Sequence, residues 1–279
     1  MRKKITISHL MEMKRTGEKI AMLTAYDYPI AKLIDEAGIE TILVGDSVSN
    51  VVLGYPDTRP VTMDEMIYHT KIVTRAVKSA FVIGDMPFMS YQISVEEAIK
   101  NAARFIKEGM ADAVKLEGTF FETIERMTNA GIPVVGHLGL TPQSASLQGG
   151  YVVQGKSYEK AKEIIKNAEN IERAGAIMLV LEMVPKEVAS IISHRLKIPV
   201  IGIGAGPDCD GQVLVIHDML GLGGNFKFLK RYSNLDTIIK NSVEEYISDV
   251  KNKKFPTEEH TFSMPENELK KLIKNYRKK

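Results

Sequence analysis

The 279-residue sequence contains no tryptophan and only one cysteine, Cys209. A single cysteine cannot form an intrachain disulfide, and this scarcity is typical of proteins from a reducing compartment. No apolar run approaches the roughly 20 residues that span a membrane, and the basic residues at 2–4 are followed by no apolar segment of a signal peptide. We therefore expect a soluble, cytoplasmic protein with no membrane partner.

The sequence also lacks a strong charge of either sign. Lys and Arg total 37, Asp and Glu total 35, and the formal net charge is +2. This balance gives no electrostatic reason to expect a nucleic-acid partner. The apolar content of 44% and the charged content of 26% are ordinary for a globular protein.

Short apolar runs without alternation recur along the chain, as in strands that are buried on both faces of a parallel sheet. We expect strands at 20–25, 41–45, 81–84, 113–117, 132–136, 177–181 and 199–203, and an eighth within 212–220. Between them lie helical segments, for which Thr62 with Glu65 and Ser94 with Glu97 have capping-box spacing, and Thr119 is expected to cap a third. This alternation favours an α/β fold, a closed (β/α)8 TIM-type barrel rather than an open sheet.

Extra helices are expected at both ends of this single barrel domain, which we expect to span residues 1–279. A short helix at 6–15 precedes Gly17. At the other end, residues 263–277 place apolar side chains at helical spacing, namely Leu269, Leu272, Ile273 and Tyr276. This amphipathic helix either closes the base of the barrel or contacts a neighbouring subunit.

Five of the expected strands end in polar residues, namely Asp46, Asp85, Lys115 with Glu117, His137 and Glu182. Each has a structural explanation when taken alone. The aspartates could cap turns, and Lys115 could pair with Glu117 inside the barrel. His137 could be a hydrogen-bonded core residue, and Glu182 could cap a loop. In a barrel, however, the C-terminal strand ends converge on the face that carries active sites, so five polar ends favour one shared site.

The acidic residues of this set indicate a hard divalent cation. Asp46, Asp85 and Glu117 are oxygen donors without a cysteine nearby, which suits Mg²⁺. A cation at that position would polarise a carbonyl oxygen and stabilise an enolate.

The remaining members of the set suit a substrate. Glu182 and His137 are candidates for general acid–base catalysis, and Lys115 could hold a substrate carboxylate. A glycine-rich loop at 138–156 is long for a connector, and we expect its part from residue 143 onward to form a mobile lid. The run GIGAG at 202–206 lacks the spacing of a dinucleotide-binding loop, so close backbone approach at the barrel mouth is the better interpretation.

Several motifs, in this order, closely resemble those of the ketopantoate hydroxymethyltransferase family. They are TAYDY at 24–28, VGDS at 44–47, DMPFM at 85–89, VKLEG at 114–118, GHLGLTPQ at 136–143 and GIGAG at 202–206. The resemblance extends from about residue 6 to about residue 262. It implies a (β/α)8 barrel of the phosphoenolpyruvate mutase type.

The resemblance also implies an activity. It is the transfer of a hydroxymethyl group from 5,10-methylenetetrahydrofolate to 3-methyl-2-oxobutanoate, which gives 2-dehydropantoate through a Mg²⁺-stabilised enolate in pantothenate and coenzyme A biosynthesis. The implied partners are the keto acid and the folate. Family members form large rings, commonly decamers, so the resemblance implies a homodecamer.

Carried over residue by residue, the resemblance assigns Mg²⁺ to Asp46 and Asp85, with Glu117 near the metal or reaching it through water. The keto acid is assigned to the same two aspartates together with Ser47 and Lys115. Ser47 and Lys115 are implied to bind its carboxylate.

The resemblance makes Glu182 the base that removes the C3 proton and places His137 by the incoming hydroxymethyl group. Two alternatives remain open. A Mg²⁺-dependent lyase acting on a keto acid would be expected to carry a cysteine in a mobile loop, and residues 118–156 contain none. A non-enzymatic barrel that serves as a scaffold would leave the aligned polar strand ends unexplained.

Overall fold

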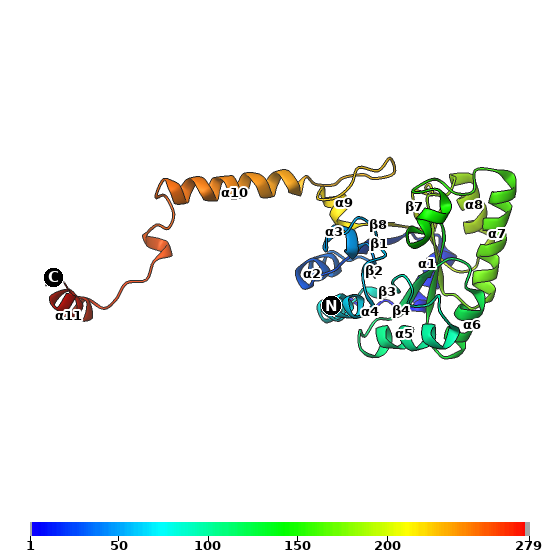
Figure 1. Ribbon diagram of the computed structural model, residues 1–279, viewed down its shortest axis with the longest axis horizontal. Coiled ribbons are helices and arrows are strands. Elements are labelled where there is room, and N and C mark those ends of the chain that lie inside the picture. Colours follow the sequence, from blue (N-terminus) through cyan, green and yellow to red (C-terminus); the bar gives the residue numbers. More distant parts are fainter. Residues whose placement is uncertain (1, 277–279) are drawn as a thin grey trace. The chain divides into compact units, whose positions relative to one another are not determined.

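The structure is a computed structural model that describes residues 2–276 (Figure 1). The chain divides into two compact units, residues 1–232 and residues 233–279. The first unit contains the strands and most of the helices. The second contains α10 (Leu235–Lys251), the 3-10 helix η2 (Glu258–His260) and α11 (Glu266–Tyr276).

The helix expected at 263–277 is present as α11, and residue 277 lies outside the described residues. In the described part of the chain, neither α10 nor α11 has a buried residue. The role of this helix at the barrel base or at a subunit contact remains a prediction, as does a single domain over residues 1–279.

Eight parallel strands form a closed barrel in chain order, and β8 pairs with β1. The strands are β1 (Ile20–Thr24), β2 (Thr41–Val44), β3 (Phe81–Asp85), β4 (Ala113–Glu117), β5 (Val134–Gly139), β6 (Met178–Glu182), β7 (Val200–Ile203) and β8 (Gly211–Leu214). The predicted (β/α)8 barrel is therefore confirmed. The eighth strand is shorter than its expected window, since α9 (Ile216–Leu220) occupies the rest.

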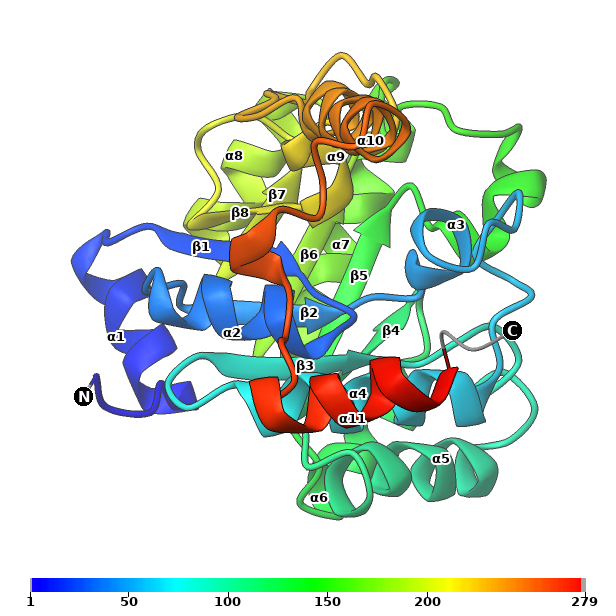
Figure 2. The same ribbon diagram turned by 90° about the vertical axis from the view of Figure 1, so that its left-hand side faces the viewer.

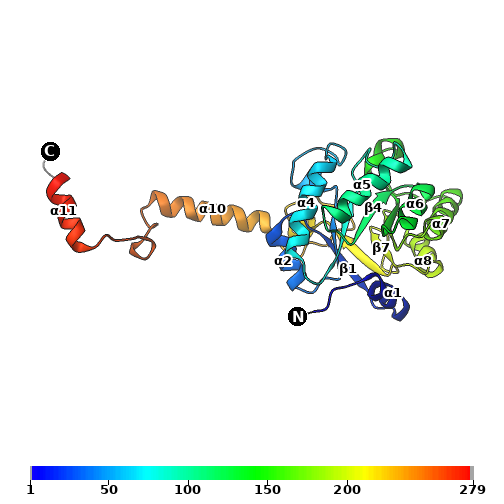
Figure 3. The ribbon, with the colours of Figure 1, turned by 90° about the horizontal axis from the view of Figure 1, so that it is seen from below.

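Helices cover the outside of the strands, as the two turned views show (Figures 2 and 3). They are α2 (Tyr28–Glu36), α4 (Met63–Ala76), α5 (Val95–Lys107), α6 (Phe121–Asn129), α7 (Tyr158–Arg173) and α8 (Lys186–Arg195), whereas α1 (Ile7–Thr16) lies at the base of the barrel and α3 (Val48–Val51) in the loop after β2. Thr62 and Glu65 form the expected capping box of α4. Ser94 accepts a hydrogen bond from the Glu97 N–H and so caps α5. The expected cap at Thr119 is wrong, because α6 begins after Phe120.

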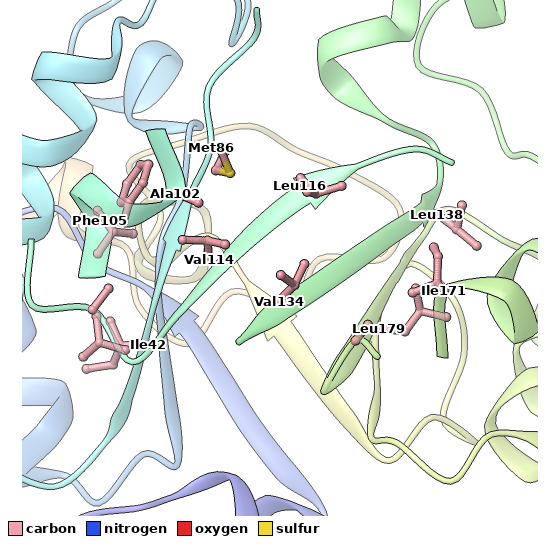
Figure 4. Packing of buried hydrophobic residues seen from close by; sticks show 14 of the residues in the cluster. Ile42, Met86, Ala102, Phe105, Val114, Leu116, Val134, Leu138, Ile171 and Leu179 are labelled. Carbon is pink, nitrogen blue, oxygen red and sulfur yellow. The ribbon is translucent and has the colours of Figure 1, made fainter. Parts of the chain in front are cut away.

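The outward-facing strand residues pack against these helices in one apolar layer (Figure 4). Two glycines bring the helices close to the sheet. A Cβ at Gly84 would collide with the ring of Phe105 on α5, and one at Gly136 would collide with Ile171 on α7. Because strand side chains alternate between faces, the neighbouring residues in these strands point into the barrel.

The inward-facing residues form a second apolar layer in the lower part of the barrel, at the N-terminal ends of the strands. It includes Ile20 of β1, Phe81 of β3 and Met178 of β6. Leu10 and Met13 of α1 join this layer, so the N-terminal helix closes the base. The polar site is thereby confined to the opposite end of the barrel.

Candidate active site

The side chains inside the barrel change from apolar to polar between one inward-facing position of a strand and the next. In four strands the polar residue stands two positions beyond a buried apolar residue that faces inward, namely Asp85 after Ile83, Lys115 after Ala113, His137 after Val135 and Glu182 after Val180. Residues two apart on a strand point to the same face, so each polar side chain continues an inward-facing column. Glu117 continues the column of β4 by one further step.

Lys115 lies at the centre of a buried charge cluster. It stands directly opposite Asp85 in the pairing of β3 with β4. Its Nζ atom lies 2.7 Å from Oδ1 and 2.9 Å from Oδ2 of Asp85, and 3.6 Å from Oε1 of Glu117. Burial alone would lower the pKa of Lys115, but the carboxylates of Asp85, Glu117 and Asp46 outweigh it and raise that pKa. Lys115 is therefore a fixed cation that pairs with Asp85 at short distance and with Glu117 at longer distance.

His137 lies between two carboxylates. Its Nδ1 atom is 3.4 Å from Oε1 of Glu117, and its Nε2 atom is 3.4 Å from Oε2 of Glu182. Neither contact has hydrogen-bond alignment, and both ring nitrogens lack a hydrogen-bond partner among the described residues. Burial and Lys115 lower the pKa of His137, and the two carboxylates outweigh them and raise it to about 9. His137 is thus not the hydrogen-bonded core residue of the structural alternative.

Asp46 and Ser47 follow β2 and enter the same site. The Asp46 N–H donates to Oδ2 of Asp85 at 3.2 Å, so these two residues are in direct contact. Burial, and then the nearby charges of Asp85 and Glu117, raise the pKa of Asp46 well above its usual range. Ser47 Oγ lies 2.8 Å from the hydroxyl of Tyr26. Asp46 and Asp85 are therefore an acidic pair, and the surroundings of Asp46 disfavour its ionised form.

A cavity of about 440 Å³ opens onto this cluster at the C-terminal end of the barrel. Its lining includes all seven predicted site residues, Asp46, Ser47, Asp85, Lys115, Glu117, His137 and Glu182. The side chain of Glu182 is 17% exposed, whereas that of His137 is 2% exposed. Glu182 is therefore the more accessible of the two acid–base candidates. Gly139, opposite Glu182 in the pairing of β5 with β6, has φ +96° and leaves no room for a Cβ beside the Glu182 carbonyl.

The outer wall of the cavity is apolar and comes from segments beyond the strands. Phe226 and Phe228 stack with ring centroids 5.5 Å apart and planes 5° apart, and both line the cavity. A Cβ at Gly204 would collide with the Phe228 ring, so the run at 202–206 serves close packing at the barrel mouth, as the sequence indicates. Tyr151, from the loop after β5, also lines the cavity. The first part of this loop forms the 3-10 helix η1 (Pro142–Gln148), and its mobility remains a prediction.

Two further residues, Gln143 and Tyr91, belong to the site, although no role for them was predicted from the sequence. Nε2 of Gln143 donates to Oδ2 of Asp46 at 2.9 Å, and the Gln143 N–H donates to Oε2 of Glu117 at 3.1 Å. Tyr91 donates from its hydroxyl to Oε1 of Gln143 at 2.6 Å. Gln143 stands at the end of the GHLGLTPQ motif, which was the only signal for it.

The donor set fits a cation that uses two protein carboxylates. Within residues 2–276, no three side chains of His, Cys, Asp or Glu are grouped closely enough to hold one metal ion. The backbone N–H of Asp46 nevertheless contacts the Asp85 carboxylate, and both residues line the cavity with hard oxygen donors that suit Mg²⁺. Mg²⁺ in enzymes often takes only one or two carboxylates and completes its shell with water and substrate oxygens. The Glu117 carboxylate instead accepts a hydrogen bond from the Gln143 N–H and lies near Lys115 and His137.

Solved structures of other proteins share this barrel fold. Phosphonopyruvate hydrolase in complex with oxalate and Mg²⁺ matches with a TM-score of 0.61 and 15% identity over 98% of this chain and 100% of that one. A phosphoenolpyruvate phosphomutase from Streptomyces platensis subsp. rosaceus matches with a TM-score of 0.61 and 14% identity over 98% and 99%. The fold is therefore the phosphoenolpyruvate mutase type of (β/α)8 barrel, with a polar site at the C-terminal ends of its strands.

Sequence relatives narrow this class to one family. The family model of ketopantoate hydroxymethyltransferase matches residues 4–258, and the chain belongs to this family. A 3-methyl-2-oxobutanoate hydroxymethyltransferase of Syntrophus aciditrophicus is 55% identical over 93% of this chain and 97% of the relative. One from Clostridium botulinum (strain Alaska E43 / Type E3) is 53% identical over 96% of this chain and 99% of the relative.

Proposed function

We propose that the protein is a 3-methyl-2-oxobutanoate hydroxymethyltransferase, which makes 2-dehydropantoate for pantothenate and coenzyme A biosynthesis. The observation that carries this proposal is a full-length match to relatives of that name at 53–55% identity. The polar cluster at the floor of the cavity supports it, because its residue types suit enolate chemistry on a keto acid.

The keto acid would bind through its two ends. Its carboxylate needs a cation and a hydrogen-bond donor, for which Lys115 and Ser47 are the candidates on the cavity lining. Lys115 is held in its charged form beside Asp85, so it can donate a hydrogen bond to the substrate carboxylate without first gaining a proton. The buried position of Lys115 strengthens this attraction, because charges interact more strongly where water is excluded.

Asp46 and Asp85 would hold Mg²⁺ beside the substrate, and Glu117 would lie near the metal or reach it through water. When bound, Mg²⁺ would polarise the keto oxygen of the substrate and so favour the enolate. Like-charge repulsion in the cluster supports this assignment: burial raises the pKa of Asp46 most, Asp85 and Glu117 raise it further, and a divalent cation would relieve the repulsion from these two charges.

Glu182 would remove the C3 proton of the keto acid. Its carboxylate ends β6 and faces the cavity, and it is more accessible than His137. His137, with a pKa raised to about 9, is protonated at neutral pH. A protonated imidazole cannot act as the base, and it can donate a proton where the hydroxymethyl group forms.

The one-carbon donor, 5,10-methylenetetrahydrofolate, would occupy the outer part of the cavity. Its flat ring system suits the aromatic faces of Phe226 and Phe228, and 227–231 supplies Lys227, Lys230 and Arg231 for its anionic glutamate tail. A homodecamer and a cytoplasmic location are our further proposals. The structure has no helix within residues 2–276 that is long and apolar enough to span a membrane.

The activity is tested with the purified full chain, 3-methyl-2-oxobutanoate, 5,10-methylenetetrahydrofolate and Mg²⁺. We expect 2-dehydropantoate to form, and we expect its formation to stop when EDTA removes the divalent cation. Cleavage of a keto-acid precursor such as a substituted isocitrate, without hydroxymethyl transfer, would instead support the lyase alternative.

A further inference from the structure

Gln143 is a buried polar residue in the segment 142–156 after β5, where Ala145 and Gly155 are also buried and the other described residues are half-buried or exposed. It is the second residue of η1 and only 2% of its surface is exposed, whereas Leu147 in the same helix is 90% exposed. A buried amide needs partners for its two donors and its acceptor, because an unpaired buried polar group is costly. The structure supplies all of them from the site.

The partners of Gln143 join the two sides of the acidic cluster. The side-chain Nε2 donates to Oδ2 of Asp46 and also to the Met86 carbonyl, both at 2.9 Å. Its backbone N–H donates to Oε2 of Glu117 at 3.1 Å. One residue of the segment after β5 thus holds two acids that come from β2 and β4.

Tyr91 sets which way the amide of Gln143 points. Its hydroxyl donates to Oε1 of Gln143 at 2.6 Å and accepts from the Glu117 N–H at 3.2 Å. With the oxygen of the amide held by Tyr91, the nitrogen faces Asp46. The hydroxyl of Tyr91 is therefore part of the same network.

We propose that Gln143 is a positioning residue that couples the segment 142–156 to cation binding by Asp46 and Asp85. This inference rests on the proposed function only in assigning a cation to those two aspartates. The amide fixes the rotation of the Asp46 carboxylate, and the backbone bond to Glu117 ties the start of the segment to the same site. Outer partners of metal-binding carboxylates typically change metal affinity by about 10–100-fold when removed.

The direct test is Mn²⁺ binding to the full chain without substrate, followed by electron paramagnetic resonance. Gln143→Met keeps the length and burial of the side chain but removes its hydrogen bonds to Asp46 and Tyr91. We expect Mn²⁺ binding to weaken about 10–100-fold. Gln154→Met is the matched control, because the Nε2 of Gln154 donates to the Val152 carbonyl in the same segment, and it should bind Mn²⁺ as the wild type does.

A second readout tests the coupling itself. In the wild type, saturating Mn²⁺ should slow proteolytic cleavage within 144–156, and in Gln143→Met cleavage should stay fast at saturating Mn²⁺. A purely structural role would lower the melting temperature of the variant while leaving both its Mn²⁺ affinity and this protection unchanged. That result would overturn the inference.

Tyr91→Phe keeps the proposal testable if Gln143→Met does not fold. It removes only the hydroxyl that orients the amide, and we expect it to weaken Mn²⁺ binding several-fold. Equal Mn²⁺ affinity in Tyr91→Phe and the wild type would contradict the inference. If the wild type itself binds no Mn²⁺ at Asp46 and Asp85, the metal site of the proposed function fails together with the inference. If the wild type binds Mn²⁺ and the variants bind it equally well, the inference alone fails.

Discussion

The ammonium group of Lys115 and the carboxylate of Asp85 form the closest ion pair inside the site, with Nζ 2.7 Å from Oδ1. The two residues stand opposite each other in the register of β3 and β4. Burial also raises the pKa of Asp85, but its cationic partner Lys115 opposes that shift, whereas burial and then the charges of Asp85 and Glu117 raise the pKa of Asp46 well above its usual range. The two aspartates that we assign to one cation therefore differ in what they contribute to stability.

Substitution of the two aspartates should have different effects on the stability of the metal-free protein. Asp85→Asn leaves Lys115 buried with only the more distant carboxylate of Glu117 as its ion-pair partner, and breaking a buried pair typically costs about 3–5 kcal/mol. Asp46→Asn removes a buried carboxylate that its neighbours repel, so the melting temperature should stay the same or rise. Differential scanning calorimetry with EDTA measures both. Equal losses of stability would contradict this account of the cluster.

Both substitutions should nevertheless abolish Mg²⁺-dependent binding of 3-methyl-2-oxobutanoate. Each removes one of the two carboxylates that we assign to the cation. Isothermal titration of the keto acid, with and without Mg²⁺, separates this loss from misfolding. Unaltered Mg²⁺ dependence in both variants would show that the cation binds elsewhere.

Phe226 should contribute to binding of the folate but not of the keto acid. Its ring is 45% exposed, stacks on Phe228 and lines the cavity. Aromatic pairs contribute about 0.5–1.5 kcal/mol beyond the area that they bury, so Phe226→Ala should raise KM for 5,10-methylenetetrahydrofolate by up to about tenfold. KM for the keto acid should not change. Phe262→Ala, at a fully exposed phenylalanine in the second unit, is the control.

Cys209 should be unreactive in the folded protein at neutral pH. Its side chain is buried, and burial, followed by the charge of Asp210, raises the pKa of the thiol to about 11. The thiolate is the reactive form, so labelling by iodoacetamide should be slow until the protein unfolds. Because this pKa is raised above its unfolded value, the stabilisation from Cys209 is present below about pH 9 and is lost as the pH rises toward 11. In Cys209→Ser this loss should be absent, and rapid labelling of the native wild type would contradict the burial.

The sequence predicts the inner face of the barrel well because strand alternation is a local rule. Lys115 and Glu117 are two residues apart, so their shared direction follows from the strand alone. The convergence of Asp85, His137 and Glu182 follows from the barrel topology. These residues were accordingly predicted to share a site, and the structure places them around one cavity.

Contacts that come from loops could not be predicted in the same way. Gln143 reaches Asp46 across 97 positions in the sequence, and its direction depends on the path of the segment after β5. Tyr91 lies in a loop after β3, where no period fixes its orientation. The wrong cap at Thr119 has a similar cause, because Gly118, with φ +96°, redirects the chain before α6 begins.

The most direct test of the proposed chemistry is exchange of the C3 proton of 3-methyl-2-oxobutanoate in D₂O, followed by NMR with Mg²⁺ and without folate. The wild type should exchange this proton, since its removal precedes the one-carbon step. Glu182→Gln keeps the size of the side chain but cannot act as the base, and loss of a general base typically costs about 10²–10⁴-fold in rate. We expect the variant to bind the keto acid and to exchange its proton slower by that factor. Exchange at the wild-type rate in Glu182→Gln would contradict the account, because Glu182 would then not be the base.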